Sequence, residues 1–293
     1  MNLDVLKTFC DLVDSGSFSR AAEMNLISQS AVSQQLAKLE RRLGTQLVNR
    51  GRGLVAPTEA GKSFYQGARD ILRRYEALLG EVRSATDAIR GVLRVGTIYS
   101  VGMYCLDPYV KRFIRAHPEV TLRVEYMRAH GIYAAVANGE LALGIVAYPE
   151  RQRLIQVIPF ITEELVAVFH SDHRLAGRKV IEAAALNGEN FVAFEADIPT
   201  RRHIDRCLKA ARVKVGVTME FDNNETLKRA VEIGAGVTIL PRTVVEREVA
   251  ARTLSYARFQ DAKPWVRPLG ILRPRGQAPT PAESMFLAML RSK

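Results

Sequence analysis

Short hydrogen-bonding side chains gather at the front of the stretch SQSAVSQQLAKLERRLG, residues 28 to 44. Amides and hydroxyls of this kind reach base edges in the major groove of a duplex without burying an unpaired charge. Basic side chains follow along the stretch and just beyond it, where they suit contacts to phosphates. We interpret the segment as a reader of double-stranded DNA, with the candidate contacts Gln29, Ser30, Ser33, Gln34, Lys38, Arg50 and Arg52.

The positive charge of the chain supports a polyanionic partner only in part. The net charge is +11, and residues 28–62 hold six basic against two acidic side chains. Residues beyond 90 hold a further 29 basic against 21 acidic side chains, so DNA binding does not explain the whole excess. A pocket for an anionic ligand is a second explanation. For residues 28–44 taken alone, a solvated helix start is the plain alternative.

No catalytic or metal-binding pattern emerges from the sequence. Among five histidines only His170 and His173 lie close together, with no cysteine or carboxylate at metal-ligand spacing. Gly234 and Gly236 supply only part of a dinucleotide fingerprint. Cys105 or Cys207 remains open as a nucleophile or redox switch, although no basic neighbour or second cysteine indicates an activated thiol. We expect no catalytic residue, no metal and no cofactor.

The sequence gives no sign of export or membrane insertion. The N-terminal stretch MNLDVLKTFCDLVDSG is amphipathic and acidic, and no run approaches 18 consecutive apolar residues. The three cysteines lie far apart in sequence, which suits a reducing compartment. We therefore expect a cytoplasmic protein without membrane contact.

The N-terminal part predicts three compact helices and a wing. Ser17 and Ser28 can cap the second and third helices, and Gly44 supplies a stop. NRGRGLVAPTEAG then reads as a short basic hairpin. Within the third helix the spacing predicts a buried stripe of Val32, Leu36, Leu39 and Leu43.

A long helix is predicted after Thr58. Its apolar residues alternate by steps of four and three, which forms a narrow heptad seam. Such a seam favours a partner helix and hence dimerisation; the alternative is one amphipathic helix packed on its own domain. The seam consists of Phe64, Ala68, Ile71, Tyr75, Leu78 and Val82.

Beyond Arg90 the pattern changes to β-branched runs that alternate with helical ones. This alternation is typical of an α/β domain with mainly parallel strands, and about 200 residues suffice for two lobes with a cleft between them. We expect a DNA-binding domain at 1–58, a dimerising linker helix at 59–90 and a two-lobed domain at 91–293. Lobe I is expected at about 91–161 and 265–293, and lobe II at about 162–264.

The chain resembles the LysR-type transcriptional regulators. The resemblance rests on FCDLVDSGSFSRAA, SQSAVSQQLAKLERRLGTQLVNR and LVAPTEAG, and the order of parts agrees over the full chain. GVLRVGT and AVEIGAGVTILP look like the first strand and a helix–strand signature of the family's effector domain. The chain departs from the family at Asn25, where Leu is usual, and at residues 141–143, where LAL replaces an acidic LDL.

The resemblance implies an α + α/β protein. Its expected parts are a winged helix-turn-helix, a long linker helix and a two-lobed effector domain like a type 2 periplasmic binding protein. The implied function is regulation of transcription, in which a small-molecule effector controls promoter binding or DNA geometry. A homodimer or homotetramer is expected. The competing hypotheses are a solute-binding module, which the helix-turn-helix disfavours, and an enzyme, for which no catalytic pattern is visible.

Three loops are expected to line the effector cleft. In such a domain ligands lie at the carboxyl ends of strands, against helix N-termini. Ser100 and Thr200 combine a hydroxyl with a helix start, and the nearby arginines suggest a small anion such as a carboxylate or phosphate metabolite. Plain helix caps and solvated arginines are the alternative. The candidate residues are Tyr99, Ser100, Val101, Arg128, Pro199, Thr200, Arg201 and Asn223.

Overall fold

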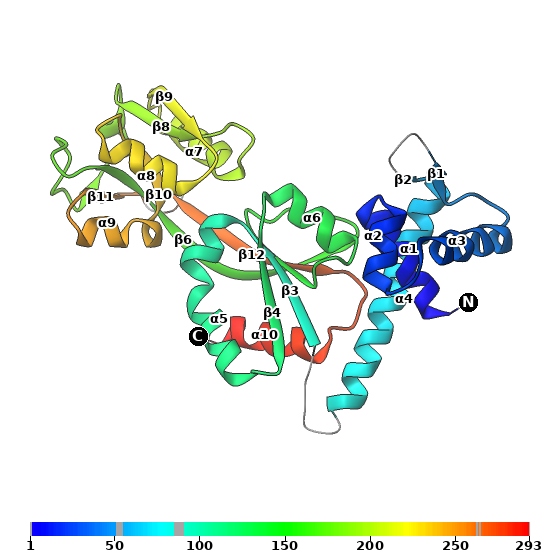
Figure 1. Cartoon of the computed structure of the whole chain (residues 1–293). Helices are drawn as coiled ribbons and strands as arrows, with labels where there is room; N and C mark the ends of the chain where they lie inside the picture. The colour runs from blue at the N-terminus through cyan, green and yellow to red at the C-terminus, as the bar shows by residue number, and fades with distance from the viewer. Residues whose placement is uncertain (1, 51–54, 85–90, 262, 264, 293) are drawn as a thin grey trace. The chain divides into compact units, whose positions relative to one another are not determined.

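The structure is a computed structural model that describes residues 2–50, 55–84, 91–261, 263 and 265–292. The chain falls into two compact units, of which the first is mainly helical and the second combines strands with helices (Figure 1). The first unit comprises Met1–Gly91, Asn138–Glu140 and Gln277–Ser284. The second comprises Val92–Ala137, Leu141–Gly276 and Met285–Lys293.

Three short helices open the chain: α1 (Leu3–Ser15), α2 (Phe18–Asn25) and α3 (Gln29–Leu43). Each begins at a side-chain cap, because oxygens of Asn2, Ser17 and Ser28 accept N–H groups of the first turn. Gly16 and Gly44 end α1 and α3 in the left-handed conformation. The predicted caps at Ser17 and Ser28 and the stop at Gly44 are confirmed.

The three helices enclose a small apolar core. From α3 this core takes Val32, Leu36 and Leu39, which are all buried. The sequence also predicted burial of Leu43, and this was wrong. Leu43 is exposed because it ends α3, beyond the last core residue of that helix.

A two-stranded hairpin follows α3. Strands β1 (Val48–Arg50) and β2 (Val55–Pro57) pair antiparallel, with Val48 opposite Pro57. The Glu40 carboxylate of α3 accepts the backbone N–H of Leu47 at 2.8 Å and that of Val48 at 3.3 Å. The predicted wing is therefore tied to the helix that precedes it.

The long helix α4 (Glu59–Ser84) begins at Thr58, whose side chain accepts the N–H of Gly61 at 2.9 Å. Only glycine fits at position 61, since a Cβ there would lie 1.8 Å from the carbonyl oxygen of Leu47. The first part of the predicted seam packs on the helical core. The rings of Phe64 and Phe9 meet edge to face with their centroids 5.2 Å apart, and Ala68 is buried.

The later part of that seam is open. Ile71, Tyr75 and Leu78 on α4 are each at least 40% exposed, although their spacing by four and three places them on one side of the helix. The side chain of Val82, the last predicted member, lies outside the described residues. The structure thus leaves a short apolar stripe on α4 uncovered.

The second unit is built on an eight-stranded sheet with the order β4-β3-β5-β12-β6-β11-β7, and β10 also pairs with β6. In lobe I lie β3 (Gly91–Thr97), a π-helix (Val101–Cys105), α5 (Asp107–Ala116), β4 (Val120–Tyr126), α6 (Ala129–Ala137), β5 (Leu143–Ala147) and α10 (Pro281–Arg291).

Lobe II holds a second core, of 27 buried residues. Strands β8 and β9 pair parallel as a separate two-stranded sheet. Its elements are β7 (Val180–Ile181), a 3-10 turn (Ala183–Leu186), β8 (Asn190–Phe194), α7 (Pro199–Ala210), β9 (Gly216–Phe221), α8 (Asn224–Glu232), β10 (Thr238–Pro241), a 3-10 turn (Arg242–Val244), α9 (Glu246–Ala250) and β11 (Leu254–Phe259).

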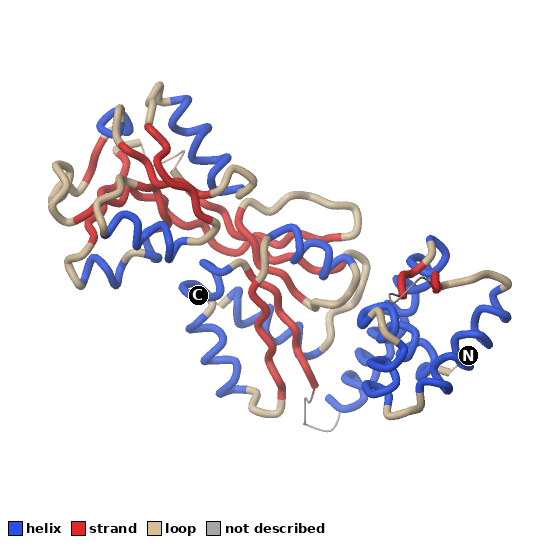
Figure 2. Tube along the Cα trace, turned by 45° about the horizontal axis from the view of Figure 1, so that its top comes forward, coloured by secondary structure: helices blue, strands red, loops and turns tan. Residues whose placement is uncertain are grey.

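Two long strands, β6 (Ile155–His170) and β12 (Val266–Pro274), join the lobes, and Figure 2 shows them running through the middle of the unit. They pair antiparallel with each other, and β12 is also antiparallel to β5. Strands β10 and β11 are antiparallel to β6 as well. The predicted parallel pairing is present between β3 and β5, β7 and β11, and β8 and β9. It fails at β6 and β12, which run against their neighbours where they cross between the lobes.

Candidate functional site

The front of α3 is accessible and begins at a well-formed cap. Contacts at this end stay local, since Ser19 Oγ donates to Gln29 Oε1 at 3.4 Å and the hydroxyls of Ser28 and Ser30 lie 2.8 Å apart. The predicted base readers therefore lie on reachable surface. Exposed side chains are Gln29, Ser30, Gln34 and Lys38, and Ser33 is half-buried.

The wing arginines are only partly described. Arg50 ends β1, but its side chain lies outside the described residues, and so does the whole of Arg52.

A polar cluster holds α4 against α1. Tyr65 Oη donates to Asp14 Oδ1 at 2.5 Å, and Arg69 Nη2 lies 3.1 Å from Asp14 Oδ2. Burial raises the pKa of the Tyr65 phenol and the hydrogen bond to Asp14 raises it further, so the phenol remains a donor at neutral pH. The linker helix is thereby fastened to the first helix by side chains as well as by apolar packing.

Asn25, where the resembled family usually has Leu, is the last residue of α2. Its Nδ2 donates to Asp11 Oδ2 at 2.8 Å and to the Ala21 carbonyl at 2.9 Å, so a polar network stands where an apolar side chain is usual. The next residue, Leu26, is 94% exposed and adopts a left-handed backbone with φ of 55°. Leu26, the apolar residue next to Asn25, therefore does not pack into the core.

A cavity of about 460 Å³ lies between the two lobes of the second unit. That volume is in the range of small-molecule sites. Its walls come from the loops after β3 and β4, the end of β5, the start of α7 and the loop before α8. Of the predicted effector residues, the structure brings to this cavity Tyr99, Ser100, Arg128, Pro199, Thr200 and Asn223.

Two predicted residues lie away from the cavity. Val101 is completely buried in the first turn of the π-helix. Arg201 points toward β8 and β9, where its guanidinium binds Asp205, the Phe194 carbonyl and Glu220. The neighbouring Arg202 lines the cavity in its place, because adjacent residues of a helix face different directions.

Arg128 lies at the cavity wall but is already engaged by three carboxylates of lobe II. Its guanidinium lies 2.8 Å from Glu195, 3.2 Å from Asp197 and 3.4 Å from Asp222. The hydrogen bond to Glu195 is the main cause of the raised pKa of Arg128. The pKa of Asp222 is lowered by hydrogen bonds from Asn223 and Arg128. This arginine therefore joins the lobes at the rim of the cavity.

The buried end of the cavity holds hydroxyls and a second arginine. Ser100 and Thr200 are both buried, and both line the cavity. Ile198, the N-cap residue of α7, offers no side-chain cap, and the first residues of this helix line the same cavity. Arg267 of β12 is 2% exposed and donates from Nη1 to Ser100 Oγ at 3.1 Å.

Sequence reasoning missed Arg267 and also Tyr148. Arg267 sits in the strand-like run WVRPLG, which says nothing of its partner across the sheet. Tyr148 follows β5 with a left-handed φ of 50°, and its ring packs at a 31° tilt against that of His203, with ring centroids 4.8 Å apart. Non-glycine residues in that conformation concentrate at ligand sites, and this signal exists only in three dimensions.

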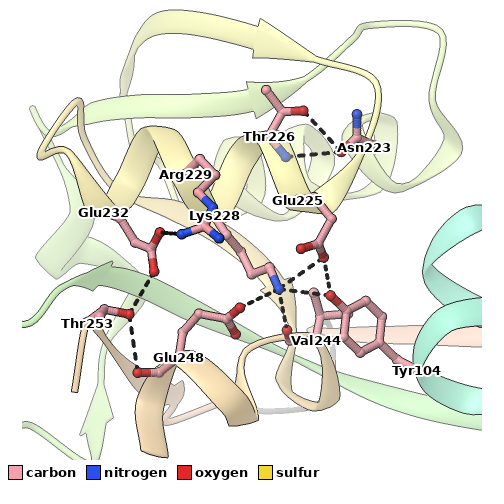
Figure 3. Close-up of polar contacts among 10 residues, drawn as sticks. All are labelled: Tyr104, Asn223, Glu225, Thr226, Lys228, Arg229, Glu232, Val244, Glu248 and Thr253. Carbon is pink, nitrogen blue, oxygen red and sulfur yellow. Dashed lines mark hydrogen bonds and ion pairs between the residues drawn. The ribbon is translucent and has the colours of Figure 1, made fainter. Parts of the chain in front are cut away.

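A second polar cluster joins the lobes around Lys228 of α8 (Figure 3). Its Nζ lies 2.7 Å from Glu248, 3.0 Å from Glu225 and 2.9 Å from the hydroxyl of Tyr104, and it also binds the Val244 carbonyl at 3.2 Å. Tyr104 also donates to Glu225 and is the one member of this cluster from lobe I.

The described residues offer no arrangement of three or more histidine, cysteine or acidic side chains suited to a metal ion. Burial raises the pKa of all three cysteines, that of Cys10 to about 12. Within the described part of the chain, every helix is too short or too polar to cross a membrane.

Two family models match the chain. "Bacterial regulatory helix-turn-helix protein, lysR family" matches residues 3–62, and "LysR substrate binding domain" matches residues 86–293. The chain is 27% identical to the HTH-type transcriptional regulator CysL of Bacillus subtilis, and the aligned region spans 100% of this chain and 97% of CysL. It is 28% identical to the RuBisCO operon transcriptional regulator of Allochromatium vinosum, over 100% and 96% of the two chains.

Solved structures show the same fold. A full-length OxyR variant from Pseudomonas aeruginosa superposes with a TM-score of 0.82 at 23% identity, over 99% of this chain and 93% of that one. The regulatory domain of Synechocystis CcmR, solved in complex with 2-PG, superposes with a TM-score of 0.63 at 26% identity. It covers 69% of this chain and 96% of its own.

Proposed function

The chain belongs to the LysR family of transcriptional regulators, and from this premise we propose that a small anion bound between its lobes controls how it holds promoter DNA. As a family member it is a DNA-binding regulator with an effector-binding domain, and not an enzyme. One observation supports the proposal that the effector is an anion. The buried Ser100 and Thr200 and the first residues of α7, a helix start without a side-chain cap, line the same cavity.

For DNA contact we propose that α3 lies in the major groove and that Gln29, Ser30, Ser33 and Gln34 read bases. The support is their accessible position on the first turns of a capped helix. Lys38, Arg50 and Arg52 would contact phosphates, which makes binding depend steeply on salt.

For assembly we propose a homodimer, or a tetramer of two such dimers. The uncovered stripe of Ile71, Tyr75 and Leu78 on α4 supports a partner helix, because it repeats at heptad spacing. Two copies then present two recognition helices, and effector binding changes their spacing. Since its target is genomic DNA, we propose that the protein works in the cytoplasm.

For the effector we propose contacts from Tyr99, Ser100, Pro199, Thr200 and Asn223. The 2-PG bound to the related CcmR domain supports a small molecule in this kind of domain. Arg128 is kept in the proposal as a rim residue, whereas Val101 and Arg201 are left out because they do not reach the cavity.

A gel-shift assay on the DNA upstream of the protein's own gene tests DNA contact. The native chain should retard this DNA, with retention that falls steeply as salt rises. Gln34→Ala should weaken retention, whereas Gln66→Ala, on the exposed side of α4, should not. Absence of retention at low salt, or equal effects of both substitutions, contradicts the proposal.

A thermal-shift screen of anionic metabolites tests the effector. Compounds that raise the melting temperature of the native chain should lose most of that effect with Thr200→Val, which keeps the shape of the side chain but removes its hydroxyl. A screen in which only neutral or cationic compounds raise the melting temperature would reject an anionic effector.

A further inference from the structure

Arg267 is a buried cation at the wall of the interlobe cavity. Its side chain is 2% exposed, and it is one of the residues that line the cavity. Its Nε donates to Glu163 Oε2 at 2.7 Å, Nη2 lies 2.6 Å from the same oxygen, and Nη1 donates to Ser100. The guanidinium thus divides its donors between a carboxylate and a residue of the proposed effector site.

A buried ion pair needs a reason beyond stability. Removing two charges from water costs as much as or more than their attraction returns, and apolar residues of similar size often serve as well. The strands could have placed an apolar pair here, because Arg267 and Glu163 lie directly opposite each other on β12 and β6. Retention of the pair beside a ligand-sized cavity is explained if the arginine also binds the ligand.

The other arginines near the cavity are less suited to hold an anion. Arg128 is bound by three carboxylates at the rim, and Arg201 is turned toward β8 and β9. Arg202 also lines the cavity, but its side chain is exposed to solvent, where a charge contact is weak. A ligand anion next to Arg128 would also face those carboxylates. At Arg267 it would meet the hydroxyl of Ser100 instead, in a cavity that Thr200 and the start of α7 also line.

We infer that Arg267 binds the anionic group of the effector while its guanidinium also pairs with Glu163. This rests on the proposed function, since it specifies the same site. The effector is then a small carboxylate or phosphate whose charged group reaches the buried end of the cavity, bridging Arg267, Ser100 and Thr200.

The position of Glu163 gives this binding a route to the fold. Its second oxygen accepts hydrogen bonds from Thr243 of lobe II and Cys105 of lobe I, each at 3.1 Å. An anion that draws on Arg267 weakens its hold on Glu163, at the level where β6 and β12 pass from one lobe to the other. Effector charge therefore acts directly on the connection between the lobes.

The test measures the affinity of the full-length chain for inorganic phosphate and for oxalate, by titration calorimetry at constant ionic strength set with chloride. The native protein should bind one of the two, which also tells phosphate from carboxylate. Arg267→Met should weaken that binding about tenfold or more, the usual effect of losing a charge-assisted hydrogen bond. Arg128→Met is the matched control at the same cavity and should change the affinity less than about threefold.

A second variant guards against misfolding. Arg267→Met alone leaves Glu163 buried without its counter-charge, whereas Arg267→Met with Glu163→Leu removes both charges and preserves an apolar fill. The double variant should retain promoter DNA in a gel shift and still not bind the anion. Native-like anion affinity in the double variant, or loss of affinity in Arg128→Met alone, overturns the assignment of Arg267.

The failures of the two proposals are distinguishable. If DNA is retained but neither anion binds the native chain, Arg267 is no anion receptor and the regulator itself stands. If DNA is not retained, the proposed function fails independently of Arg267.

Discussion

Lys228 offers a quantitative test of how the lobes are held together. Replacement by Met keeps most of the aliphatic volume and removes a charge whose side chain is only 3% exposed. Four oxygen partners lose their cation, and two of them are carboxylates, Glu225 and Glu248. Removing one partner of a buried ion pair costs about 3–5 kcal/mol, and we expect a loss of unfolding free energy in that range.

The charge state of Lys228 makes this expectation valid over the neutral range. Burial acts to lower the pKa of its amine, but hydrogen bonds to Glu248, Tyr104 and Glu225 outweigh it and raise the pKa above the usual 10.5. A raised pKa means that the contribution is complete below about pH 10 and is lost only as the pH rises through the folded value. The effect of Lys228→Met should therefore be the same at pH 6 and pH 8.

Urea unfolding monitored by tryptophan fluorescence measures the loss. Trp265 is the one tryptophan of the chain; it is buried in the core of lobe II and stacks on Phe259. The urea midpoint of Lys228→Met should fall by about 1–2 M at unchanged slope. Tyr104→Phe, which removes only the lobe I member, should cost about 1–2 kcal/mol. A change below about 0.5 kcal/mol for Lys228→Met would refute the reasoning.

Four further predictions concern other positions in the chain. Leu26→Asn should stabilise the protein by about 1 kcal/mol in thermal unfolding, because Leu26 is strained in the left-handed region and 94% exposed; a lower melting temperature would contradict this. Gly61→Ala should destabilise by at least about 2 kcal/mol, since its Cβ would collide with the Leu47 carbonyl, whereas Gly67→Ala on the same helix meets no neighbour and should stabilise by about 1 kcal/mol. The three thiols should react slowly with Ellman's reagent at pH 8 in the native protein and rapidly in urea, since burial raises their pKa; fast native reaction would favour a redox role. The pKa of Asp222 is held below 3.8, so the stability that this carboxylate contributes is complete above about pH 4 and is lost as the pH falls through the lower folded value. Asp222→Asn should therefore reduce the drop in melting temperature between pH 5 and pH 3.

Local signals predicted the N-terminal unit well. The caps at Ser17 and Ser28 and the stop at Gly44 depend on residues within a few positions, and all three are confirmed. The family and the two-lobed α/β architecture are likewise confirmed. The direction of the strands was not predictable from their own residues, because antiparallel pairing of β12 with β5 and β6 depends on segments more than a hundred positions apart.

Site residues were predictable where loop and helix start coincide. Ser100, Pro199 and Thr200 reach the cavity because each lies at the start of a helix that follows a strand. The ion-pair partners of the arginines were not predictable, since a charged residue in a loop does not reveal its counter-charge. Three carboxylates of the other lobe engage Arg128, whereas Arg267 was hidden in a strand.

The carboxylates at the rim of the cavity suggest an electrostatic role for Arg128 other than direct contact with the ligand. Glu195, Asp197 and Asp222 would together repel an anion that approaches the cavity, since these side chains are 41–63% exposed and their charges are near its rim. Arg128 lies among them, so it reduces this barrier and at the same time ties lobe I to lobe II. If Arg267 holds the anion, Arg128→Met should slow anion association by less than about threefold and leave dissociation nearly unchanged, and the slowing should diminish as salt screens the rim. Stopped-flow association rates at low and high salt check this, and an effect confined to dissociation would place the anion at Arg128 instead.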